Sequence, residues 1–523
     1  MTDTSAKQYL LVPAMPAPNG RLHLGHVAGP YLNLDILARH LRRDGHKASI
    51  VCASDPFDSY IPLRAQQAEV DPAALAQESC AGIIDDLAYM NVQIDLFIDP
   101  LAAEHRDAYL AAHRDLVERL DGEHAIRCVE EQMPWSQSRQ QFVSGSYLTG
   151  HCPACEAAVS GFFCEDCGAH FEPDEVRAPR ARWGEEVPGR ALDNLFFEIR
   201  QPEALIEQLQ GTQTPEVFLD IARRHVRRPS PQVRVTNHAG WGLPCEVRGQ
   251  ARTLFGHGLL FGAVRFVGDC FARAAGLACN PFDCDSPVIT VNGFGIDNSV
   301  SHLVSIQAMA MADGISKPFD HFLINHFYTL EGRKFSTSQG WAIWVEDIAR
   351  EGRIPSDALR YFLASTSPIH GRTDFRRADF ERFLSEDYAG LLTRAGSALA
   401  AVAAPRQTSQ VWLAPVMAAC DEQAQVLSFA HFDPRALSQS IARWERRFDT
   451  LADELDRYWW AKGLALLAYP LLPSLSLALW HALGHVGEVS REAFGQCTTP
   501  LPGGLPAPFA VAVRAPASLE ALS

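Results

Sequence analysis

Short apolar runs near the start of the chain predict a parallel sheet. The first run, Tyr9–Ala14, ends in a loop rich in proline, asparagine and glycine, and a helical pattern of apolar positions begins near Leu24. A second run, Ala48–Ala53, follows about one helix later. Strand, helix and strand in this order form a βαβ unit, which builds doubly wound parallel sheets. Such sheets bind their ligands at the carboxyl ends of the strands.

Later apolar runs predict that an insertion interrupts this sheet. Between residues 121 and 244 glycine, proline, arginine and cysteine become denser, and strand-like runs return at Gly258–Val267, Val288–Val291 and Phe322–Leu330. We therefore predict an α/β fold in which residues 1–120 and 245–330 form a split, doubly wound, Rossmann-like domain. Residues 121–244 would form the inserted domain.

The last part of the chain has the pattern of a helical bundle. From about Asp379 alanine and leucine recur at helical spacing, which predicts a bundle over residues 379–510 and a loosely packed tail over residues 511–523. The most apolar stretch, Leu464–Leu483, is interrupted by prolines and serines, so two packed helices explain it better than a membrane span. We expect no association with a membrane.

Composition and charge narrow the class of protein. The chain has 523 residues, 47% of them hydrophobic, and a formal net charge of −16, which suits a large globular protein and argues against a general nucleic-acid coat. A local basic cluster is more commonly a solvated helix face than a binding patch; it comprises Arg223, Arg224, Arg227 and Arg228. Residues Met1–Gln8 lack the features of a signal peptide, and we expect a cytoplasmic protein.

Four of the 13 cysteines form two close pairs. Cys152-Pro-Ala-Cys155 and Cys164-Glu-Asp-Cys167 are separated by eight residues, so each pair can chelate one edge of a metal tetrahedron. Gly168 permits a tight turn after the second pair. Because protein would fill all four positions, the spacing predicts a structural Zn²⁺ site, and four free thiols in a loop are the less common explanation. The scattered cysteines suit a reducing compartment.

Two histidines follow the first predicted strand. His23-Leu24-Gly25-His26 comes shortly after Asn19-Gly20, where a strand-to-helix turn would point a helix N-terminus at a polyphosphate. Gly25 leaves room for adenine or ribose near the backbone, and two imidazoles one turn apart can donate hydrogen bonds to a pentavalent α-phosphate. Two histidines at this spacing are weakly diagnostic alone, because surface pairs and metal-site pairs are commoner.

A loop that contains a lysine lies far downstream. The segment Lys334-Phe335-Ser336-Thr337-Ser338 is flanked by Gly332 and Gly340, so the lysine can swing toward a departing pyrophosphate. Taken by itself, this segment would more often be a serine-rich surface turn.

In this order and at this separation, the two segments resemble the H-I-G-H and K-M-S-K-S signatures of class I aminoacyl-tRNA synthetases. The resemblance is greatest to methionyl-tRNA synthetases, because Ala14-Met15-Pro16, the stretch Cys52 to Asp55 and the cysteine pairs follow in that family's order. It covers residues 9 to about 375 and implies that the split Rossmann-like domain is of the HUP type. It implies that residues 331–378 form a mobile loop and a region that contacts the tRNA stem, and that the bundle binds an anticodon.

The resemblance implies an enzyme that joins an amino acid to the α-phosphate of Mg-ATP and then transfers it to tRNA. The implied catalytic residues are His23, His26 and Lys334. The implied ATP contacts are Asn19, His23, Gly25, His26, Asp297, Lys334, Ser336 and Ser338. The implied contacts to methionine, or to a related amino acid, are Met15, Asp55, Phe255, Phe261 and His302. In this scheme Asp55 holds the ammonium group and Asp297 the ATP ribose.

Several positions depart from the family pattern. Ile296 and Thr337 stand where the family has lysines, so two cations that would neutralise the triphosphate are missing; candidates to replace them are Arg333 and Arg265. The aromatic-rich methionine segment is replaced by residues 254–262, and Ala17 stands where the family has a pocket tyrosine. A related or bulkier amino acid is therefore an alternative to methionine.

The bundle leaves the acceptor open. Trp459 and Trp460 lie near a position where the family stacks an aromatic ring on an anticodon base, although they fit a bundle core at least as well. Arg394 and Ala398 stand where the family presents an asparagine and an arginine to the anticodon. We therefore rank three hypotheses: a methionyl-type ligase with tRNA as acceptor, then adenylation for transfer to a small molecule or carrier protein, then a non-catalytic binding or regulatory relative.

Overall fold

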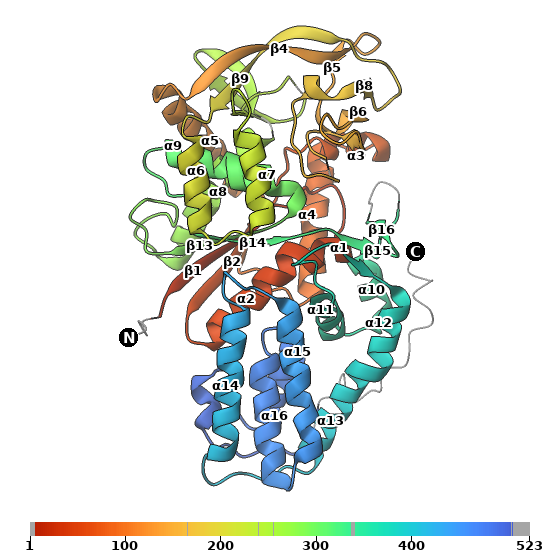
Figure 1. Cartoon of the computed structure of the whole chain (residues 1–523), viewed down its shortest axis with the longest axis vertical. Coiled ribbons are helices and arrows are strands. Elements are labelled where there is room, and N and C mark those ends of the chain that lie inside the picture. Colours follow the sequence, from red (N-terminus) through yellow and green to blue (C-terminus); the bar gives the residue numbers. More distant parts are fainter. Residues whose placement is uncertain are drawn as a thin grey trace.

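A five-stranded parallel sheet lies at the centre of the molecule, with the strand order β14-β13-β1-β2-β3 (Figure 1). The computed structural model describes residues 6–164, 166–238, 240–254, 256–335, 340–503 and 505. The strands of the central sheet are β1 (Gln8–Pro13), β2 (Lys47–Ala53), β3 (Leu96–Ile98), β13 (Ile289–Gly295) and β14 (His321–Asn325). Because β1 pairs with β2 on one side and with β13 on the other, the strand order reverses at β1. A crevice for ligands is expected at the carboxyl end of such a reversal.

Both faces of this sheet are buried, which explains why its strands read as continuous apolar runs. Along β1, Tyr9 and Leu11 enter one hydrophobic core, whereas Leu10 and Val12 enter the other. The helices that contribute to the first core include α2 (Leu32–Arg43) and α4 (Pro72–Tyr89). Those of the second include α5 (Ala103–Gly122), α8 (His257–Ala275) and α9 (Ile306–Ala312). The predicted doubly wound α/β sheet is therefore confirmed.

One predicted strand is wrong. Residues Gly258–Val267 form the first half of the long helix α8, which follows Gly256 and ends at Gly276 in a left-handed conformation (φ +64°). A buried apolar run carries little periodic signal, so that strand and helix are hard to distinguish within it. The other two predicted runs do form strands. Most of Val288–Val291 lies in β13, and Phe322–Leu330 lies largely in β14 and β15 (Tyr328–Leu330).

The segment between α5 and α8 builds smaller sheets at one end of the molecule (Figure 1). One sheet contains β4 (Ile126–Ser136), β5 (Gln141–Phe142), β9 (Gly189–Glu198) and β10 (Gln232–Arg234). A second contains β6 (Leu148–His151), β7 (Ala158–Ser160) and β8 (Arg177–Ala181), and the hairpin β11 (Leu243–Val247) with β12 (Gln250–Leu254) follows. Helices α6 (Pro202–Gly211) and α7 (Glu216–Val226) return the chain toward the central sheet.

A small three-stranded sheet follows the central one. Its order is β16-β15-β17, with β16 at Arg333–Lys334 and β17 at Thr373–Phe375. Between β16 and β17 lie α10 (Val345–Glu351) and α11 (Ser356–Ser365). The chain then enters the predicted helical region, which consists of α12 (Arg377–Phe383), α13 (Ala389–Ala400), α14 (Gln410–Val426), α15 (Pro434–Glu445), α16 (Glu454–Ala468) and α17 (Pro473–Ala482).

A buried arginine joins these helices to the central domain. Arg360 of α11 is fully buried, and it donates to Asp35 of α2 (2.6 Å) and to the carbonyl oxygen of Leu471 between α16 and α17 (2.8 Å). Removing one partner of such a buried pair typically costs about 3–5 kcal/mol. Leu464–Leu483 forms parts of α16 and α17, as predicted, and in the described part of the chain no helix combines the length and apolarity needed to cross a membrane.

Candidate active site

The two histidines of the first motif form the start of a helix at the carboxyl end of β1. His23 is the N-cap of α1 (Leu24–His26), and the two imidazole rings stack with centroids 3.6 Å apart. The backbone N–H of His26 donates to Nδ1 of His23 (3.2 Å), and that of His23 donates to Nδ1 of His26 (3.3 Å). Because both Nδ1 atoms accept hydrogen bonds, each neutral ring carries its proton on Nε2. Both rings can therefore donate from Nε2 to a ligand.

The environment keeps His23 neutral. His23 is buried, and burial lowers the pKa of its imidazole well below the usual value; the neighbouring His26 and Lys334 lower this pKa further. His26 lies exposed beside it. A neutral imidazole with its N–H on Nε2 suits an anionic ligand that is held by hydrogen bonds and by a separate cation.

The lysine loop meets the histidines in space. Phe335 is buried and stacks on His23 with ring centroids 4.9 Å apart, and the charge of Lys334 acts on the His23 ring. A β-carbon at Gly25 would lie 2.8 Å from Phe335, so the missing side chain at Gly25 accommodates the protein's own ring in this structure. Farther along, Leu24 donates its N–H to the carbonyl oxygen of Ile343 (3.0 Å). The two distant motifs thus share one site, whereas Ser336, Thr337 and Ser338 lie outside the described residues.

Asp55 stands beside the first motif at the carboxyl end of β2. Its backbone N–H donates to the carbonyl oxygen of Pro16 (2.9 Å), and its carboxylate accepts from the N–H of Phe57 (3.3 Å). Burial raises the pKa of the Asp55 carboxyl to about 7, and the nearby carboxylate of Asp58 adds to this rise. Two neighbouring acids with raised pKa values favour a bound cation such as an ammonium group.

Asp297 lies after β13, on the other side of β1. A β-carbon at Gly295 would lie 2.6 Å from its Oδ1, so the carboxylate folds back over a glycine. Its carbonyl oxygen accepts from Nε2 of His170 (2.9 Å), which belongs to the inserted segment. Ile296, in place of the family's lysine, packs its side chain against the hydrophobic core. No positive charge therefore arises at position 296.

Most of the remaining predicted site residues are buried or half-buried. Asn19 is half-buried in the loop before α1, and Met15 packs against the second core. His302 is buried in η5 (Val300–Ser305), where its Nδ1 lies 2.6 Å from Oδ1 of Asn292 and its ring stacks on Phe294. Phe261 is fully buried within α8. Phe255 lies outside the described residues.

Sequence reasoning missed Trp241. Its Nε1 donates to the carbonyl oxygen of Pro56 (2.9 Å), directly next to Asp55, and its ring lies 6.3 Å from that of Phe57. The two positions are 185 residues apart, and only a tryptophan in the glycine-rich segment 240–242 signalled it.

Both candidate replacement cations already have partners in the structure. Arg265 pairs with Asp283 (2.7 Å) and donates to Ser316 (3.0 Å). The guanidinium of Arg333 lies over the ring of Trp341, 4.5 Å from its centroid. Arg265 is thus held by an acid and a hydroxyl, and Arg333 is engaged by an aromatic ring.

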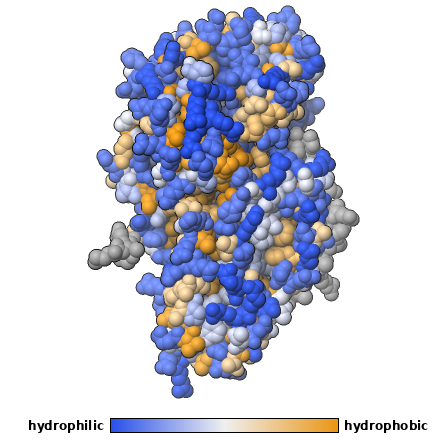
Figure 2. Space-filling view, viewed as in Figure 1, coloured by the Kyte–Doolittle hydropathy of each residue, from blue (hydrophilic) through white to orange (hydrophobic). Residues whose placement is uncertain are grey.

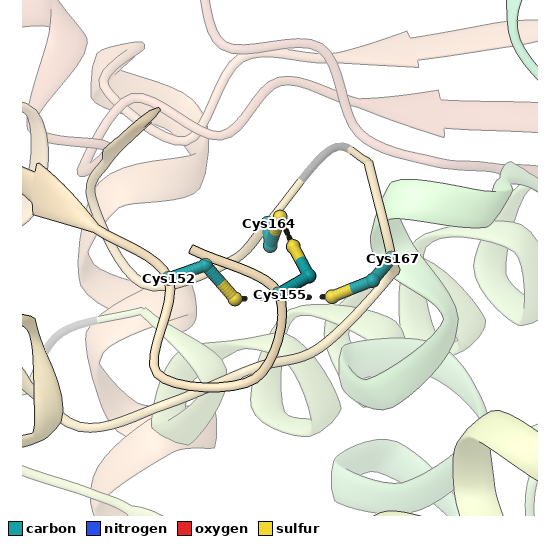
Figure 3. A group of neighbouring side chains, drawn as sticks. All are labelled: Cys152, Cys155, Cys164 and Cys167. Atoms are coloured by element: carbon teal, nitrogen blue, oxygen red, sulfur yellow. Dashed lines mark hydrogen bonds between the residues drawn. The ribbon is translucent and has the colours of Figure 1, made fainter. Parts of the chain in front are cut away.

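The four paired cysteines converge between β6 and the loop after β7 (Figure 3). Their sulfur atoms all lie within 4.8 Å of one another; Cys152 and Cys167 are 3.8 Å apart, and Cys155 and Cys164 are 3.5 Å apart. A tetrahedral Zn²⁺ with bonds of ~2.3 Å needs sulfurs about 3.8 Å apart, so the cluster could hold this ion.

Each cysteine pair ends in a tight turn of the same kind. Gly168 donates its N–H to the carbonyl oxygen of Cys164 (2.9 Å) at φ +69°, and Glu156 donates to that of Cys152 (3.0 Å) at φ +64°. The prediction for Gly168 is thus correct, and a glutamate takes the equivalent position in the first pair.

The bundle tryptophans form core. Trp459 and Trp460 are 2% and 0% exposed, so they cannot stack on a base in this structure. Arg394 pairs with Glu445 (2.8 Å), and Ala398 is fully buried. On the basic face of α7, Arg223 pairs with Asp220 (2.8 Å) and with Glu216, which agrees with a solvated helix face. The side of the whole molecule drawn in Figure 2 is largely hydrophilic, and hydrophobic side chains gather near its middle.

Comparison with known proteins identifies relatives. The profile of the family described as tRNA synthetases class I (M) matches residues 9–395. A methionine–tRNA ligase of Flavobacterium johnsoniae is 27% identical over 386 residues, covering 72% of this chain and 53% of the relative. That of Chlorobaculum tepidum is 26% identical over 538 residues, covering 93% of this chain and 74% of the relative. The chain thus spans about half the length of the first relative and three quarters of the second.

A solved structure shares the fold. Methionyl-tRNA synthetase of Mycobacterium tuberculosis, bound by methionyl-adenylate, matches with a TM-score of 0.72 and 17% identity, covering 97% of this chain and 100% of that one. A second structure of the protein from this organism, also in complex with methionyl-adenylate, matches with a TM-score of 0.70 and 18% identity, covering 97% and 99% of the two chains.

Proposed function

The chain belongs to the class I tRNA synthetases of the M type, and from this premise we propose that it activates an amino acid with ATP and transfers it to tRNA. Methionine, or a related amino acid, is the proposed substrate. The observation that carries the proposal is the meeting of the histidine pair with the lysine loop at the carboxyl edge of the parallel sheet. Lys334 supplies a positive charge there, and the two imidazoles supply donors.

In the proposed reaction an oxygen of the amino-acid carboxylate attacks the α-phosphorus of Mg-ATP. The bond to the β-phosphate breaks, pyrophosphate leaves, and an aminoacyl adenylate forms. His23 and His26 donate from Nε2 to the α-phosphate oxygens as charge develops on them. Lys334 follows the leaving pyrophosphate. Further proposed ATP contacts are Asn19, Gly25, Asp297, Ser336 and Ser338, with Asp297 on the ribose and Mg²⁺ bound to the phosphates.

The amino acid would lie between Asp55 and the core beneath the sheet edge. The Asp55 carboxylate binds its ammonium group, which the raised pKa of the Asp55–Asp58 pair favours. Proposed contacts to the side chain are Met15, Phe255, Phe261 and His302, and Trp241 adds an aromatic wall beside Asp55. In the second step a tRNA 3′ hydroxyl attacks the adenylate carbonyl, and AMP leaves.

The cysteine cluster would hold a structural zinc ion. Its four sulfurs lie within 4.8 Å of one another, which suits a tetrahedral ion, and four protein ligands would leave no position for substrate. The ion would stabilise the inserted segment, whose His170 contacts the carbonyl oxygen of Asp297. Loss of the metal is therefore expected to disturb the ribose side of the site indirectly.

One observation favours a second candidate, transfer of the activated amino acid to a small molecule or carrier protein. Trp459 and Trp460 are buried, and Arg394 is held by Glu445, so these bundle positions offer no ready contact to an anticodon. This candidate keeps the adenylation step and changes only the acceptor.

Exchange of labelled pyrophosphate into ATP tests the proposal, with each amino acid in turn. We expect methionine or a close relative to support exchange, and we expect the same amino acid to appear on tRNA when tRNA is added. Exchange without charging of tRNA would favour the second candidate. Failure of every amino acid to support exchange would contradict both and leave a non-catalytic relative.

A further inference from the structure

A second cation shares the exposed face of the small sheet with Lys334. Thr329 of β15 pairs with Lys334 of β16 on one side and with Asp374 of β17 on the other. Residues directly opposite one another, and residues two apart along a strand, point to the same face of a sheet. Lys334, Thr329 and Asp374 therefore share one face of the sheet. Phe327, two positions before Thr329, and Arg372, two positions before Asp374, lie on the same face.

Ring contacts confirm this register. The Lys334 Nζ lies 5.7 Å from the centroid of the half-buried Phe327 ring, and the Arg372 Cζ lies 6.0 Å from the same centroid. A backbone hydrogen bond joins β15 and β17 at this point, because the N–H of Thr373 donates to the carbonyl oxygen of Phe327 (3.2 Å). Lys334 and Arg372 are thus the two cations around one aromatic ring.

The acid on this face does not neutralise Arg372. Asp374 accepts from Thr329 Oγ1 (2.8 Å) and from the N–H of Gly332 (2.8 Å), and it pairs with Arg376 (3.2 Å). With the residues that the structure describes, Arg372 forms no ion pair within 4.0 Å, and its side chain is exposed. Lys334 and Arg372 thus place two positive charges around one ring, and among the described residues no carboxylate pairs with Arg372. Such an arrangement favours the binding of an anion.

The other arginines near the loop are placed differently. Arg333 pairs in register with the buried Leu330, on the opposite face of β16, where its guanidinium covers Trp341. Arg265 is held by Asp283. Position 296 carries an isoleucine that packs into the core. Among these positions, only Arg372 lies on the face of Lys334.

We propose that Arg372 contacts the β- and γ-phosphates of ATP, and the pyrophosphate that leaves, and thereby replaces a positive charge missing from the lysine loop. This inference rests on the proposed function, because it assigns a residue to the same reaction. A polyphosphate that extends from the histidine pair past Lys334 would run along the Phe327 ring toward Arg372. The planar guanidinium can bind two phosphate oxygens in a fixed bidentate geometry, which the ammonium group of a lysine does not offer.

The test compares Arg372→Gln, Arg372→Lys and a matched control, Arg382→Gln, in the full chain. Arg382 is an exposed arginine on α12 that pairs with Asp379 (2.9 Å). Binding of ATP and of inorganic tripolyphosphate is measured by calorimetry, and the KM values for pyrophosphate and amino acid are measured by exchange. For Arg372→Gln we expect binding and the KM for pyrophosphate to weaken roughly ten- to hundredfold, as for loss of one charge-assisted hydrogen bond.

A direct role of Arg372 also predicts what stays constant. The KM for the amino acid should not change, Arg372→Lys should recover part of the loss, and Arg382→Gln should resemble the wild type. If Arg372→Gln and Arg382→Gln behave alike in both measurements, the assignment is wrong while the proposed function stands. If the wild type binds ATP but exchanges with no amino acid, the proposed function fails, and the binding comparison alone decides the role of Arg372. If the wild type binds neither ligand, both proposals are wrong.

Discussion

Replacing His26 with alanine removes one of the two imidazole Nε2–H donors. The Nδ1 of His26 accepts from the N–H of His23, which leaves its Nε2–H for the α-phosphate. One preorganised donor of this kind contributes about 2.7–4 kcal/mol to the transition state. At 1.36 kcal/mol per tenfold change, we expect kcat for pyrophosphate exchange to fall roughly 100- to 1000-fold. The KM for the amino acid should change little, because the proposed ligand of the ammonium group is Asp55.

A structural cost accompanies this change and must be separated from it. Alanine cannot accept from the N–H of His23, and it loses the stacked ring that lies 3.6 Å away. Loss of the cap costs on the order of 1 kcal/mol and loss of the stacking about 0.5–1.5 kcal/mol. Thermal unfolding of the same samples measures this part, and exchange is compared per folded molecule.

Two further variants complete the experiment. His26→Asn keeps a side-chain donor and is expected to retain more activity than His26→Ala. His431→Ala, which removes an exposed histidine on the loop between α14 and α15, should leave the exchange rate unchanged. Exchange by folded His26→Ala at a rate within threefold of the wild type would refute the placement of the phosphate site.

Four other outcomes follow from the geometry. Because burial keeps His23 neutral, kcat should stay level from pH 8 down to about pH 6, and a transition with a midpoint near 6.5 would show instead that a charged imidazole takes part. Because the pKa of Asp55 is raised to about 7, the KM for the amino acid should rise as the pH falls below 7, whereas a flat KM profile would exclude Asp55 as the ammonium ligand. The pKa of Asp55 is raised from the ordinary value of 3.8, so the contribution of this carboxyl to folding stability is full below about pH 4 and is lost as the pH rises through 7. Asp55→Asn should therefore raise Tm more at pH 8 than at pH 5. Equal shifts in Tm at the two pH values would argue against this linkage. Cys164→Ala should release zinc, as measured by metal analysis, and lower Tm, while Cys128→Ala, an exposed cysteine outside the cluster, should do neither.

Local sequence was enough for the elements whose signal is local. The strands β1 and β2 and the helical region after Asp379 could be predicted because their periodicity and length lie within one segment. The cysteine cluster could be predicted for a similar reason, since ligand type and spacing are properties of a short stretch. The meeting of the histidines with Lys334 could be expected only because two motifs occurred together in a known order.

Tertiary structure alone decided the features that depend on which segments touch. The run Gly258–Val267 was predicted as a strand but forms a helix. Because most of its side chains are buried, its sequence lacks the periodicity that distinguishes a helix from a strand. Trp459 and Trp460 are buried in the core of the bundle, and Arg265 pairs with Asp283. Both results depend on packing between elements, which no local sequence pattern encodes. Arg372 stands with Lys334 because a parallel pairing joins β15 to β17 across two helices. Composition and spacing determine which side chains a segment presents, but the neighbour that each one meets is set by strand register and helix packing over the whole chain.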